Sequence, residues 1–263
     1  MIVVKFGGTS VGDADAIRRA ASIVVSRGDR RPIVVVSAMA GVTNALLAIA
    51  EQSSRGQLIG AIRSIEVLRE RHMHEAETLL GDTDECAEVC AEMSAMIDEL
   101  AHLTEALNTL GDVTPRSLDA IAAYGEQLSS QLVVAAFKRC GVPAEHVDAR
   151  DVVITDDAFT RAEPNVDAIG EASLRLLAPL ARDGRVPVLG GFIGSNARHL
   201  TTTLGRGGSD YSAALIGAAL QAEAIEIWTD VDGMLTADPR VVEGAHVLER
   251  VEGPRHVLAP RAQ

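Results

Sequence analysis

The sequence predicts an α/β protein in which a mainly parallel sheet is sandwiched between helices. Three short apolar runs, at residues 1–4, 32–37 and 186–194, lack the alternation of polar and apolar residues that marks a half-exposed strand. Such runs are typical of strands buried on both faces of a parallel sheet. Segments with apolar residues at helical spacing separate the runs, and glycine-rich turns follow them. In an open α/β sheet, ligands bind at the edge where these turns lie.

Length and composition exclude several classes of partner. A chain of 263 residues can bury a large core as one large domain or two lobes. The net charge of −13 argues against nucleic acid and an anionic membrane surface as partners. No apolar run reaches transmembrane length and the chain opens on a strand, so we expect a cytoplasmic protein without a signal peptide. The three cysteines lack further ligands at a recognisable spacing, so we expect reduced thiols and no metal site.

The first motif is a strand, a glycine turn and a helix. The opening strand leads into Lys5, and Gly7 and Gly8 follow it. We expect Asp13 to cap the helix and Gly28 to end it in the left-handed conformation. This order of elements lets backbone N–H groups and a helix N-terminus bind an anion.

Lys5 is one of only two lysines in a chain that has 22 arginines. A lysine kept beside the glycines of such a chain favours a compact point charge that reaches into a phosphate group. A surface lysine after an edge strand is the alternative interpretation.

Residues 38–110 contain a small-residue turn and then a long helical region. The turn, residues 38–44, follows the second strand and ends in hydroxyl and amide groups. From residue 45 to 110 the pattern predicts at least two helices, broken at residues 81–82, that form an excursion from the core. This excursion contains no catalytic constellation, so we interpret it as scaffold or interface. His72 and His74 lie on different sides of a helix, and we expect them to face solvent.

Glu126 follows Gly125 in a helix that is otherwise rich in small and apolar residues. A carboxylate in this setting is expensive to bury without a partner. Glu126 is therefore either a solvated residue on a helix face or a receptor for an ammonium group. Strand segments are expected within residues 146–156 and a further amphipathic helix at residues 166–181.

A second glycine loop, residues 201–210, opens a helix that we expect to run through Ala222. It fits neither of the familiar nucleotide-binding motifs, GxxxxGK[ST] and GxGxxG. A strand at residues 224–228 and a turn at residues 229–233 follow, and the remainder is irregular.

The two glycine loops together predict a split phosphate clamp, with Lys5 on one loop and Arg206 and Asp210 on the other. Phosphoryl transfer depends mainly on charge neutralisation and positioning. Arg206 can bind a carboxylate and Glu126 an amine, which indicates a small zwitterionic substrate. A carboxylate nucleophile is already ionised at pH 7 and needs no general base.

These motifs together resemble those of the aspartate kinase family, from residue 1 to about residue 242. The segments that carry the resemblance are residues 5–10, 37–44, 125–126, 190–194, 203–210 and 228–240. The resemblance implies the amino-acid-kinase fold, with a substrate lobe at residues 1–195 that includes the helical excursion and a nucleotide lobe at residues 196–263. It implies transfer of the ATP γ-phosphoryl group to the β-carboxylate of L-aspartate. The product, 4-phospho-L-aspartate, opens the pathway to lysine and threonine.

The resemblance also implies a role for each matching residue. Lys5 and Asp210 would be catalytic, Lys5 on the transferring phosphoryl group and Asp210 orienting it. The aspartate pocket would comprise Ser37, Thr43, Glu126, Phe192, Arg206 and Ser209. The nucleotide site would comprise Gly7, Gly8, Thr9, Gly207, Gly208, Thr229, Asp230, Leu235 and Arg240. Mg²⁺ would be held mainly by the phosphates of ATP. A homo-oligomer or fusion to a further domain is left open.

Two departures from the family pattern lead to further expectations. Leu235 stands where relatives often have a tyrosine, and no lysine follows Lys138 to fill a nucleotide-side role. Residues 252–260 do not match the family, so we expect an incomplete nucleotide lobe and no regulatory ACT domains.

Two functions other than aspartate kinase are left open. One is a kinase of another carboxylate, such as glutamate or N-acetylglutamate, and the other is a non-catalytic homologue that binds ligands or a partner chain. Glu126 argues against the acetylated substrate, whose nitrogen carries no charge.

Overall fold

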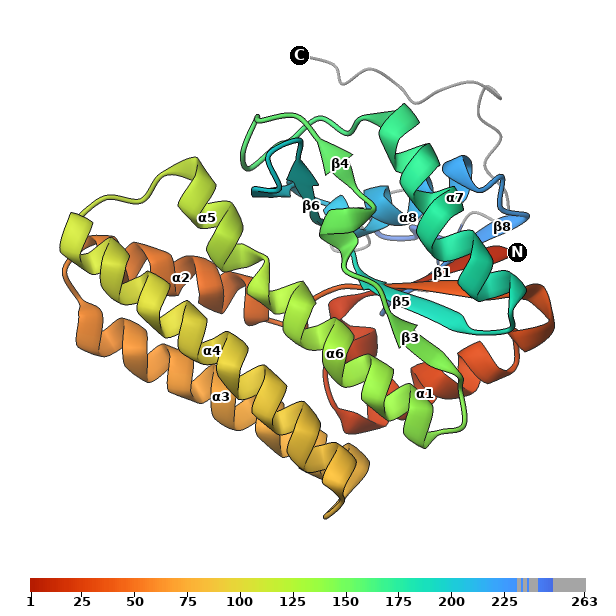
Figure 1. The fold of residues 1–263 in the computed structure, drawn as a ribbon, viewed down its shortest axis with the longest axis horizontal. Helices are drawn as coiled ribbons and strands as arrows, with labels where there is room; N and C mark the ends of the chain where they lie inside the picture. The colour runs from red at the N-terminus through yellow and green to blue at the C-terminus, as the bar shows by residue number, and fades with distance from the viewer. Residues whose placement is uncertain (231–232, 234–235, 237–240, 248–263) are drawn as a thin grey trace. The chain divides into compact units, whose positions relative to one another are not determined.

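A computed structural model describes residues 1–230, 233, 236 and 241–247. The chain divides into two compact units, Met1–Trp228 and Thr229–Gln263. The fold described below is that of the first unit (Figure 1). Within the described residues, no helix is both long and apolar enough to cross a membrane.

The first unit is built on a five-stranded sheet in which every neighbouring pair is parallel. In spatial order its strands are β3 (Ala144–His146), β5 (Val186–Gly190), β2 (Pro32–Val36), β1 (Ile2–Phe6) and β8 (Ala224–Trp228). A smaller sheet contains β4 (Ile154–Thr155), β6 (Ile193–Asn196) and β7 (Thr201–Thr203). The predicted α/β fold with a mainly parallel sheet between helices is therefore confirmed.

Helices cover both faces of the large sheet (Figure 1). On one face, Ile2, Val4 and Phe6 pack with residues of α1 (Ala14–Val25) and α6 (Tyr124–Arg139). On the other face, Val3 and Ile33 pack with residues of α7 (Val166–Arg182) and α8 (Gly208–Ala219). Strands β1, β2 and β5 are buried along their whole length, which explains why their sequences are continuous apolar runs.

The helical excursion contains three long helices and a short one. These are α2 (Val42–Ser54), α3 (Leu58–Leu80), α4 (Asp84–Leu110) and α5 (Pro115–Ala122). The first three pack against one another at one side of the molecule (Figure 1). Thr114 begins α5 with a capping box, in which its hydroxyl accepts the Ser117 N–H and the Ser117 hydroxyl accepts the Thr114 N–H.

The expectation that His72 faces solvent is wrong. His72 is fully buried on the inner stripe of α3, between Leu68 and Ala76 at helical spacing. Its Nδ1 lies 2.7 Å from the Leu68 carbonyl oxygen, and its Nε2 has no hydrogen-bond partner. Burial holds the pKa of His72 below its ordinary value. His74, two residues further on, is exposed as expected.

Several predicted boundaries also differ from the structure. Asp13 caps α1 as expected, but the helix ends at Val25, and Gly28 opens a short 3₁₀ helix. The left-handed residue of this connection is Arg31, with φ of 53°. The run at residues 186–194 divides between β5 and β6 because the chain turns at residues 191–192 to enter the smaller sheet. Helix α8 ends at Ala219 rather than at residue 222.

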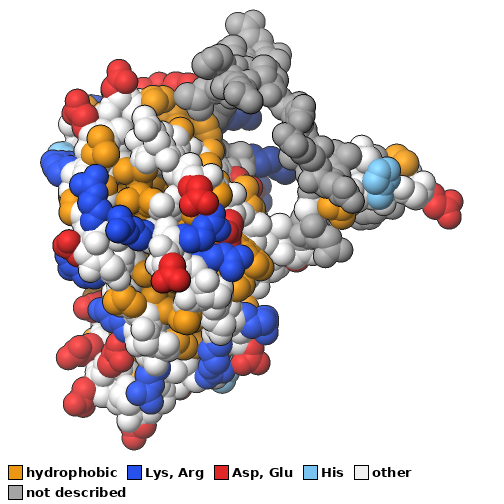
Figure 2. All heavy atoms as spheres, turned by 90° about the vertical axis from the view of Figure 1, so that its right-hand side faces the viewer, with side chains coloured by type: hydrophobic (Ala, Val, Ile, Leu, Met, Phe, Trp, Pro, Cys, Tyr) orange, Lys and Arg blue, Asp and Glu red, His pale blue; other side chains and the backbone are white. Residues whose placement is uncertain are grey.

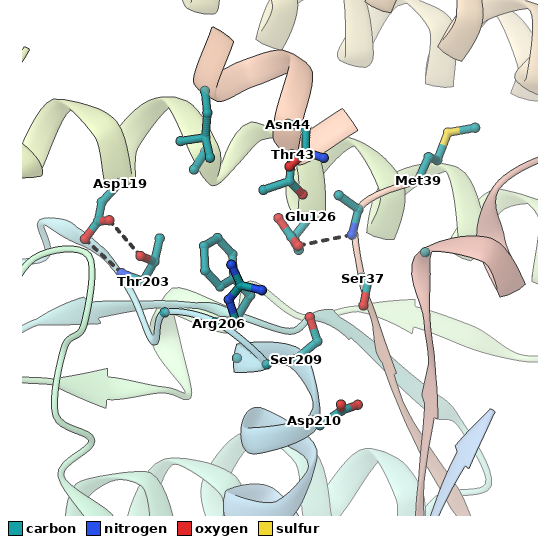
Figure 3. Close-up of a pocket in the computed structure, with 18 of the residues that line it drawn as sticks. Ser37, Met39, Thr43, Asn44, Asp119, Glu126, Thr203, Arg206, Ser209 and Asp210 are labelled. Carbon is teal, nitrogen blue, oxygen red and sulfur yellow. Dashed lines mark hydrogen bonds between the residues drawn. The ribbon is translucent and has the colours of Figure 1, made fainter. Parts of the chain in front are cut away.

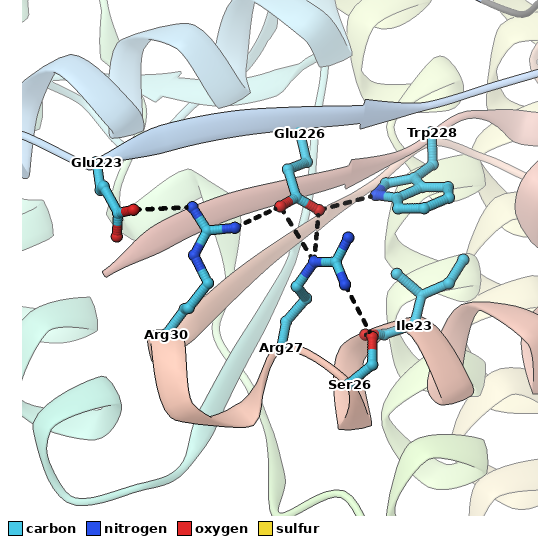
Figure 4. Close-up of polar contacts among 7 residues, drawn as sticks. All are labelled: Ile23, Ser26, Arg27, Arg30, Glu223, Glu226 and Trp228. Atoms are coloured by element: carbon cyan, nitrogen blue, oxygen red, sulfur yellow. Dashed lines mark hydrogen bonds and ion pairs between the residues drawn. The ribbon is translucent and has the colours of Figure 1, made fainter.

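The edge strand β8 is tied to the connection between α1 and β2 (Figure 4). Glu226 accepts hydrogen bonds from Arg27 Nε at 3.1 Å and from Arg30 Nη1 at 2.8 Å. The Trp228 carbonyl accepts the Gly7 N–H at 2.9 Å and the Ser10 hydroxyl at 3.2 Å. Strand β8 therefore positions the first glycine turn.

Candidate active site

A cavity of about 610 Å³ opens at the carboxyl ends of β1, β2 and β5 (Figure 3). Its walls come from the loops after these strands and from α2, α5, α6 and the first turn of α8. The predicted site residues that line it are Lys5, Gly8, Ser37, Thr43, Glu126, Phe192, Arg206, Gly207, Gly208, Ser209 and Asp210. The structure therefore brings together both predicted catalytic residues and the whole predicted aspartate pocket.

Lys5 enters the cavity from the face of β1 that packs against α8. Successive residues of a strand point to opposite faces, so Lys5 shares its face with Val3, which packs with Ala213 and Ile216 of α8. The Lys5 side chain is buried, and its Nζ lies 2.6 Å from Asp210 Oδ1 in the first turn of α8. The N-terminal end of a helix favours a carboxylate. The two predicted catalytic residues thus form an ion pair across the cavity floor.

The glycine turns offer fewer free amides than the motifs suggest. The Gly7 N–H donates to the carbonyl of the last residue of β8 at 2.9 Å, and the Gly208 N–H donates within its own turn at 3.0 Å. No described residue accepts a hydrogen bond from the N–H of Gly8 or Gly207. Gly207 is left-handed, with φ of 74°, and caps the N-terminus of α8. Of the four glycines predicted to bind the nucleotide, Gly8 and Gly207 are therefore the two whose amides have no acceptor among the described residues.

Glu126 is buried in the first turn of α6, with 3% of its surface exposed. Its Oε1 accepts the Ala38 N–H at 3.1 Å, and its Oε2 is buried without a hydrogen-bond partner. Burial raises the pKa of Glu126 to about 8, although the hydrogen bond from Ala38 opposes the shift. A Cβ atom on Gly190 would lie 2.9 Å from Glu126 Cβ, so glycine is needed there for this packing. Of the two roles left open by the sequence, the solvated helix face is excluded.

Arg206 extends into the cavity from the turn before α8 (Figure 3). Gly205 and Gly207 flank it in the left-handed conformation, with φ of 77° and 74°. Arg206 is exposed and makes no ion pair with any residue that the structure describes. Phe192, which lines the same cavity, has φ of 65°, and a Cβ atom on Gly208 would lie 2.8 Å from the Phe192 ring. Strained backbone of this kind clusters at functional sites.

Sequence reasoning missed Asp119, a buried carboxylate of α5 that lines the same cavity. Its Oδ2 accepts the Thr160 N–H at 2.8 Å and the Thr203 N–H at 2.9 Å, and its Oδ1 accepts the Thr203 hydroxyl at 2.7 Å. Burial raises the pKa of Asp119, and these hydrogen bonds oppose the shift. Asp119 thus fixes the end of β7, from which the Arg206 turn departs.

None of the remaining predicted nucleotide residues that the structure describes is among the residues that line the cavity. Gly7 and Thr9 belong to the first glycine turn but do not line the cavity. Thr229 and Asp230 open the second unit, where the Thr229 hydroxyl lies 3.0 Å from Asp230 Oδ1. The two predicted residues outside the part of the chain that the structure describes are Leu235 and Arg240.

The sequence model of the amino acid kinase family matches residues 1–254. The chain belongs to the amino acid kinase family. The match confirms the fold that the motifs implied, and it extends past residue 242, where the motif resemblance ended.

Several members of this family named as aspartokinases are similar to the chain. Lysine-sensitive aspartokinase 3 of Escherichia coli (strain K12) is 39% identical over 254 residues, which cover 95% of this chain and 54% of that protein. Chloroplastic aspartokinase 3 of Arabidopsis thaliana is 35% identical over 247 residues, 92% of this chain and 43% of that protein. The crystal structure of E. coli aspartokinase III in complex with aspartate and ADP matches with a TM-score of 0.85 and 38% identity.

That structural match covers 94% of this chain and 53% of the E. coli chain. The chain therefore spans about half the length of the curated relatives that it matches. The resemblance to aspartate kinases is confirmed at the level of sequence and fold.

Proposed function

We propose that this protein is an aspartate kinase, which transfers the γ-phosphoryl group of ATP to the β-carboxylate of L-aspartate. One observation carries the proposal. The Oε2 atom of Glu126 is buried without a hydrogen-bond partner among the described residues, in the wall of a cavity that Lys5 also lines. An unpaired buried carboxylate oxygen is costly, and an α-ammonium group would satisfy it. The similarity to E. coli aspartokinase III, crystallised with aspartate and ADP, supports the same substrates.

In the proposed complex, aspartate lies between Glu126 and Arg206. Glu126 receives the α-ammonium group, and the exposed Arg206 guanidinium binds the α-carboxylate. Ser37, Thr43 and Ser209 supply hydroxyl groups to the same cavity. The β-carboxylate then points toward Lys5. This arrangement recognises both charged ends of the amino acid and leaves the reacting group free.

The reaction needs positioning and charge neutralisation rather than a base. An oxygen of the ionised β-carboxylate forms a bond to the γ-phosphorus, while the bond from that phosphorus to the oxygen shared with the β-phosphate breaks. The products are 4-phospho-L-aspartate and ADP. In the proposed reaction, Lys5 stabilises the charge on the transferring group, and the amides of Gly8 and Gly207 donate to phosphate oxygens. Asp210 holds Lys5 in position through their ion pair.

Mg²⁺ enters the proposed site with ATP. Among the described residues, no group of three or more His, Cys, Asp or Glu side chains is arranged to hold a metal ion. Mg²⁺ at kinase sites takes only one or two protein carboxylates and otherwise phosphate oxygens and water. The half-exposed Asp210 carboxylate fits that mode. When bound, the ion would neutralise charge on the β- and γ-phosphates.

The division into a substrate lobe at residues 1–195 and a nucleotide lobe at residues 196–263 remains part of this proposal, as does a cytoplasmic location. On the face of the molecule in Figure 2, acidic and basic side chains are interspersed. This mixture agrees with small-molecule substrates rather than a nucleic acid as the ligand.

The test is turnover of the full chain with ATP, Mg²⁺ and L-aspartate in hydroxylamine, which traps an acyl phosphate as a hydroxamate. L-Glutamate and N-acetyl-L-glutamate serve as parallel substrates. We expect aspartate hydroxamate and ADP in equal amounts, with little product from the other two acids. A preference for glutamate would show a sister kinase. Nucleotide binding without turnover of any of the three acids would show a non-catalytic homologue.

A further inference from the structure

Arg71, in the helical excursion, contacts two loops of the candidate active site at once. It extends from α3, and its Nη1 donates to the Ala40 carbonyl at 2.8 Å. Its Nη2 donates to the Gly12 carbonyl at 3.0 Å. Ala40 belongs to the loop after β2 and lines the cavity, and Gly12 ends the glycine turn after β1. One partly buried guanidinium therefore joins the two loops.

The two loops already touch at the point that Arg71 braces. The Ala40 N–H donates to the Gly8 carbonyl at 3.1 Å, so the loops share one direct backbone hydrogen bond. A Cβ atom on Gly8 would lie 2.8 Å from the Ala38 carbonyl oxygen, which shows how closely they approach. A Cβ atom on Gly12 would lie 3.6 Å from Ala40 Cβ. The two loops thus approach each other closely. The Arg71 bridge adds a second polar connection to the hydrogen bond between Ala40 and Gly8.

Glu75, one helical turn beyond Arg71, extends the same bracing. Its Oε2 accepts the Ala14 N–H at 2.6 Å, at the start of α1. Helix α3 therefore contacts the first glycine turn in two places. Arg71 binds the carbonyl of Gly12, at the end of the turn, and Glu75 binds the N–H of Ala14, the first residue of α1. Arg71 and Glu75 lie four residues apart and so share one face of α3. Together they hold this face against the end of the glycine turn and the start of α1.

The loops that Arg71 joins serve the two halves of the proposed reaction. The turn after β1 offers the free Gly8 amide to a phosphate, next to Lys5. The loop after β2 holds Glu126 through the Ala38 N–H and leads into α2, whose first turn brings Thr43 to the cavity. The separation of these loops sets the distance between the phosphate end and the amino-acid end of the cavity.

We propose that Arg71 is a positioning residue that sets the distance between the phosphate-binding turn and the aspartate-binding loop. This inference rests on the proposed function. Arginine suits the task because its planar fork presents two donors in fixed geometry, whereas a lysine ammonium is a single point of contact. The excursion is then part of the catalytic apparatus rather than scaffold alone.

The experiment compares Arg71→Met, Arg71→Lys and a matched control, Arg63→Met, in the full chain. Arg63 is also on α3 but is exposed and has no partner among the described residues. Amide hydrogen exchange in residues 7–14 and 38–44 reports the loops without any need for turnover. Steady-state kinetics with ATP and L-aspartate report the reaction.

We expect Arg71→Met to speed exchange in both loops and to leave α7 unchanged. We expect kcat to fall roughly 10- to 100-fold, the scale of a misplacement of about 1 Å between reacting groups, while the KM for each substrate changes less than about threefold. Arg71→Lys should restore part of kcat, and Arg63→Met should match the wild type in every measurement.

Unchanged exchange in the two loops, or faster exchange with wild-type kcat, would overturn the positioning role. An Arg71→Met protein that loses thermal stability but keeps kcat per folded molecule would assign Arg71 to structure alone. Absence of aspartate turnover in the wild type would instead contradict the proposed function, and the exchange measurement would still decide whether Arg71 joins the loops.

Discussion

Lys5 and Asp210, 205 positions apart in the sequence, form an ion pair with Nζ and Oδ1 separated by 2.6 Å. The lysine lies near the end of the central strand β1, and the carboxylate lies in the first turn of α8, which packs against the same face of that strand. In the proposed reaction, this pair keeps a buried ammonium group in place before ATP binds. Phosphate oxygens can then share the lysine without a rearrangement of the cavity floor.

Replacing Lys5 by methionine should abolish most of the turnover while leaving the fold intact. The loss of one preorganised charge donor lowers kcat by roughly 10²–10³. Lys138→Met is the matched control, because Lys138 is the only other lysine and is exposed at the end of α6. Steady-state kinetics and thermal unfolding of both variants check this prediction. Near-wild-type kcat in Lys5→Met would remove Lys5 from the mechanism.

Aspartate binding should strengthen as pH rises toward 8 and then level off. Glu126 has a pKa of about 8 in the free protein, so at pH 7 it is mostly protonated and must lose that proton to pair with an ammonium group. Calorimetry at pH 7 in buffers of different ionisation enthalpy should detect proton release on binding. In Glu126→Gln the release should vanish. The same proton release by wild type and variant would contradict the assignment.

The raised pKa of Glu126 also gives a stability prediction with a defined sign. A carboxyl group with a raised pKa favours the folded state fully below its unfolded pKa, near 4.5, and loses that contribution as pH rises to about 8. The free energy of unfolding of Glu126→Gln should therefore increase relative to the wild type across this window. Denaturant titrations at several pH values measure the difference, and a difference that does not vary with pH would be inconsistent with burial of the charge.

Removing the Asp119 carboxylate should loosen the Arg206 turn. Asp119→Ala leaves the buried N–H group of Thr203 without an acceptor, at a cost of about 1–3 kcal/mol, and also the partly buried N–H group of Thr160. We expect lower thermal stability and a KM for aspartate that rises more than that for ATP. Asp119→Asn retains an acceptor oxygen and should recover most of both. Equal effects on the two KM values would indicate a general loss of packing.

The sequence predicted the loops that line the cavity because their signals are local. Lys5 with its glycines, and Arg206 with Asp210, each occupy a short segment between a strand and a helix, and that arrangement has few alternatives. The residues alone left the role of Glu126 open, because its burial depends on Ala38 in the loop after β2 and on Gly190 at the end of β5, both distant in the sequence. A carboxylate next to a glycine in a helix carries no sign of such neighbours.

Asp119 and His72 show two different ways in which sequence reasoning failed. The partners of Asp119 lie 41 and 84 positions away, so no spacing in the sequence could reveal them. His72 did have a local signal, since it continues the apolar stripe through Leu68 and Ala76, but the polar residues around it favoured solvent. Arg71 was overlooked for the same reason as Asp119, because its acceptors are backbone carbonyls of remote loops.

His72 should make the fold less stable in mild acid. Its pKa is lowered by burial, so the unfolded chain binds a proton near pH 6.5 that the folded chain resists. The stabilisation is present above pH 6.5 and is lost as pH falls below it, by up to about 1.4 kcal/mol per pH unit. His72→Gln should flatten this part of the stability curve, whereas the exposed control His74→Gln should not. Parallel curves for wild type and His72→Gln would contradict the prediction.

The most direct test of the account compares the binding of L-aspartate and succinate, which differ by the ammonium group, to wild type and Glu126→Gln at pH 8. A charge-assisted hydrogen bond contributes about 1.5–3 kcal/mol, so the wild type should prefer aspartate by roughly ten- to a hundredfold. Glu126→Gln should bind the two acids with nearly equal affinity, while its affinity for ATP stays within about twofold of the wild type. A variant that keeps the full preference for aspartate would contradict the assignment of Glu126 and the substrate inferred from it.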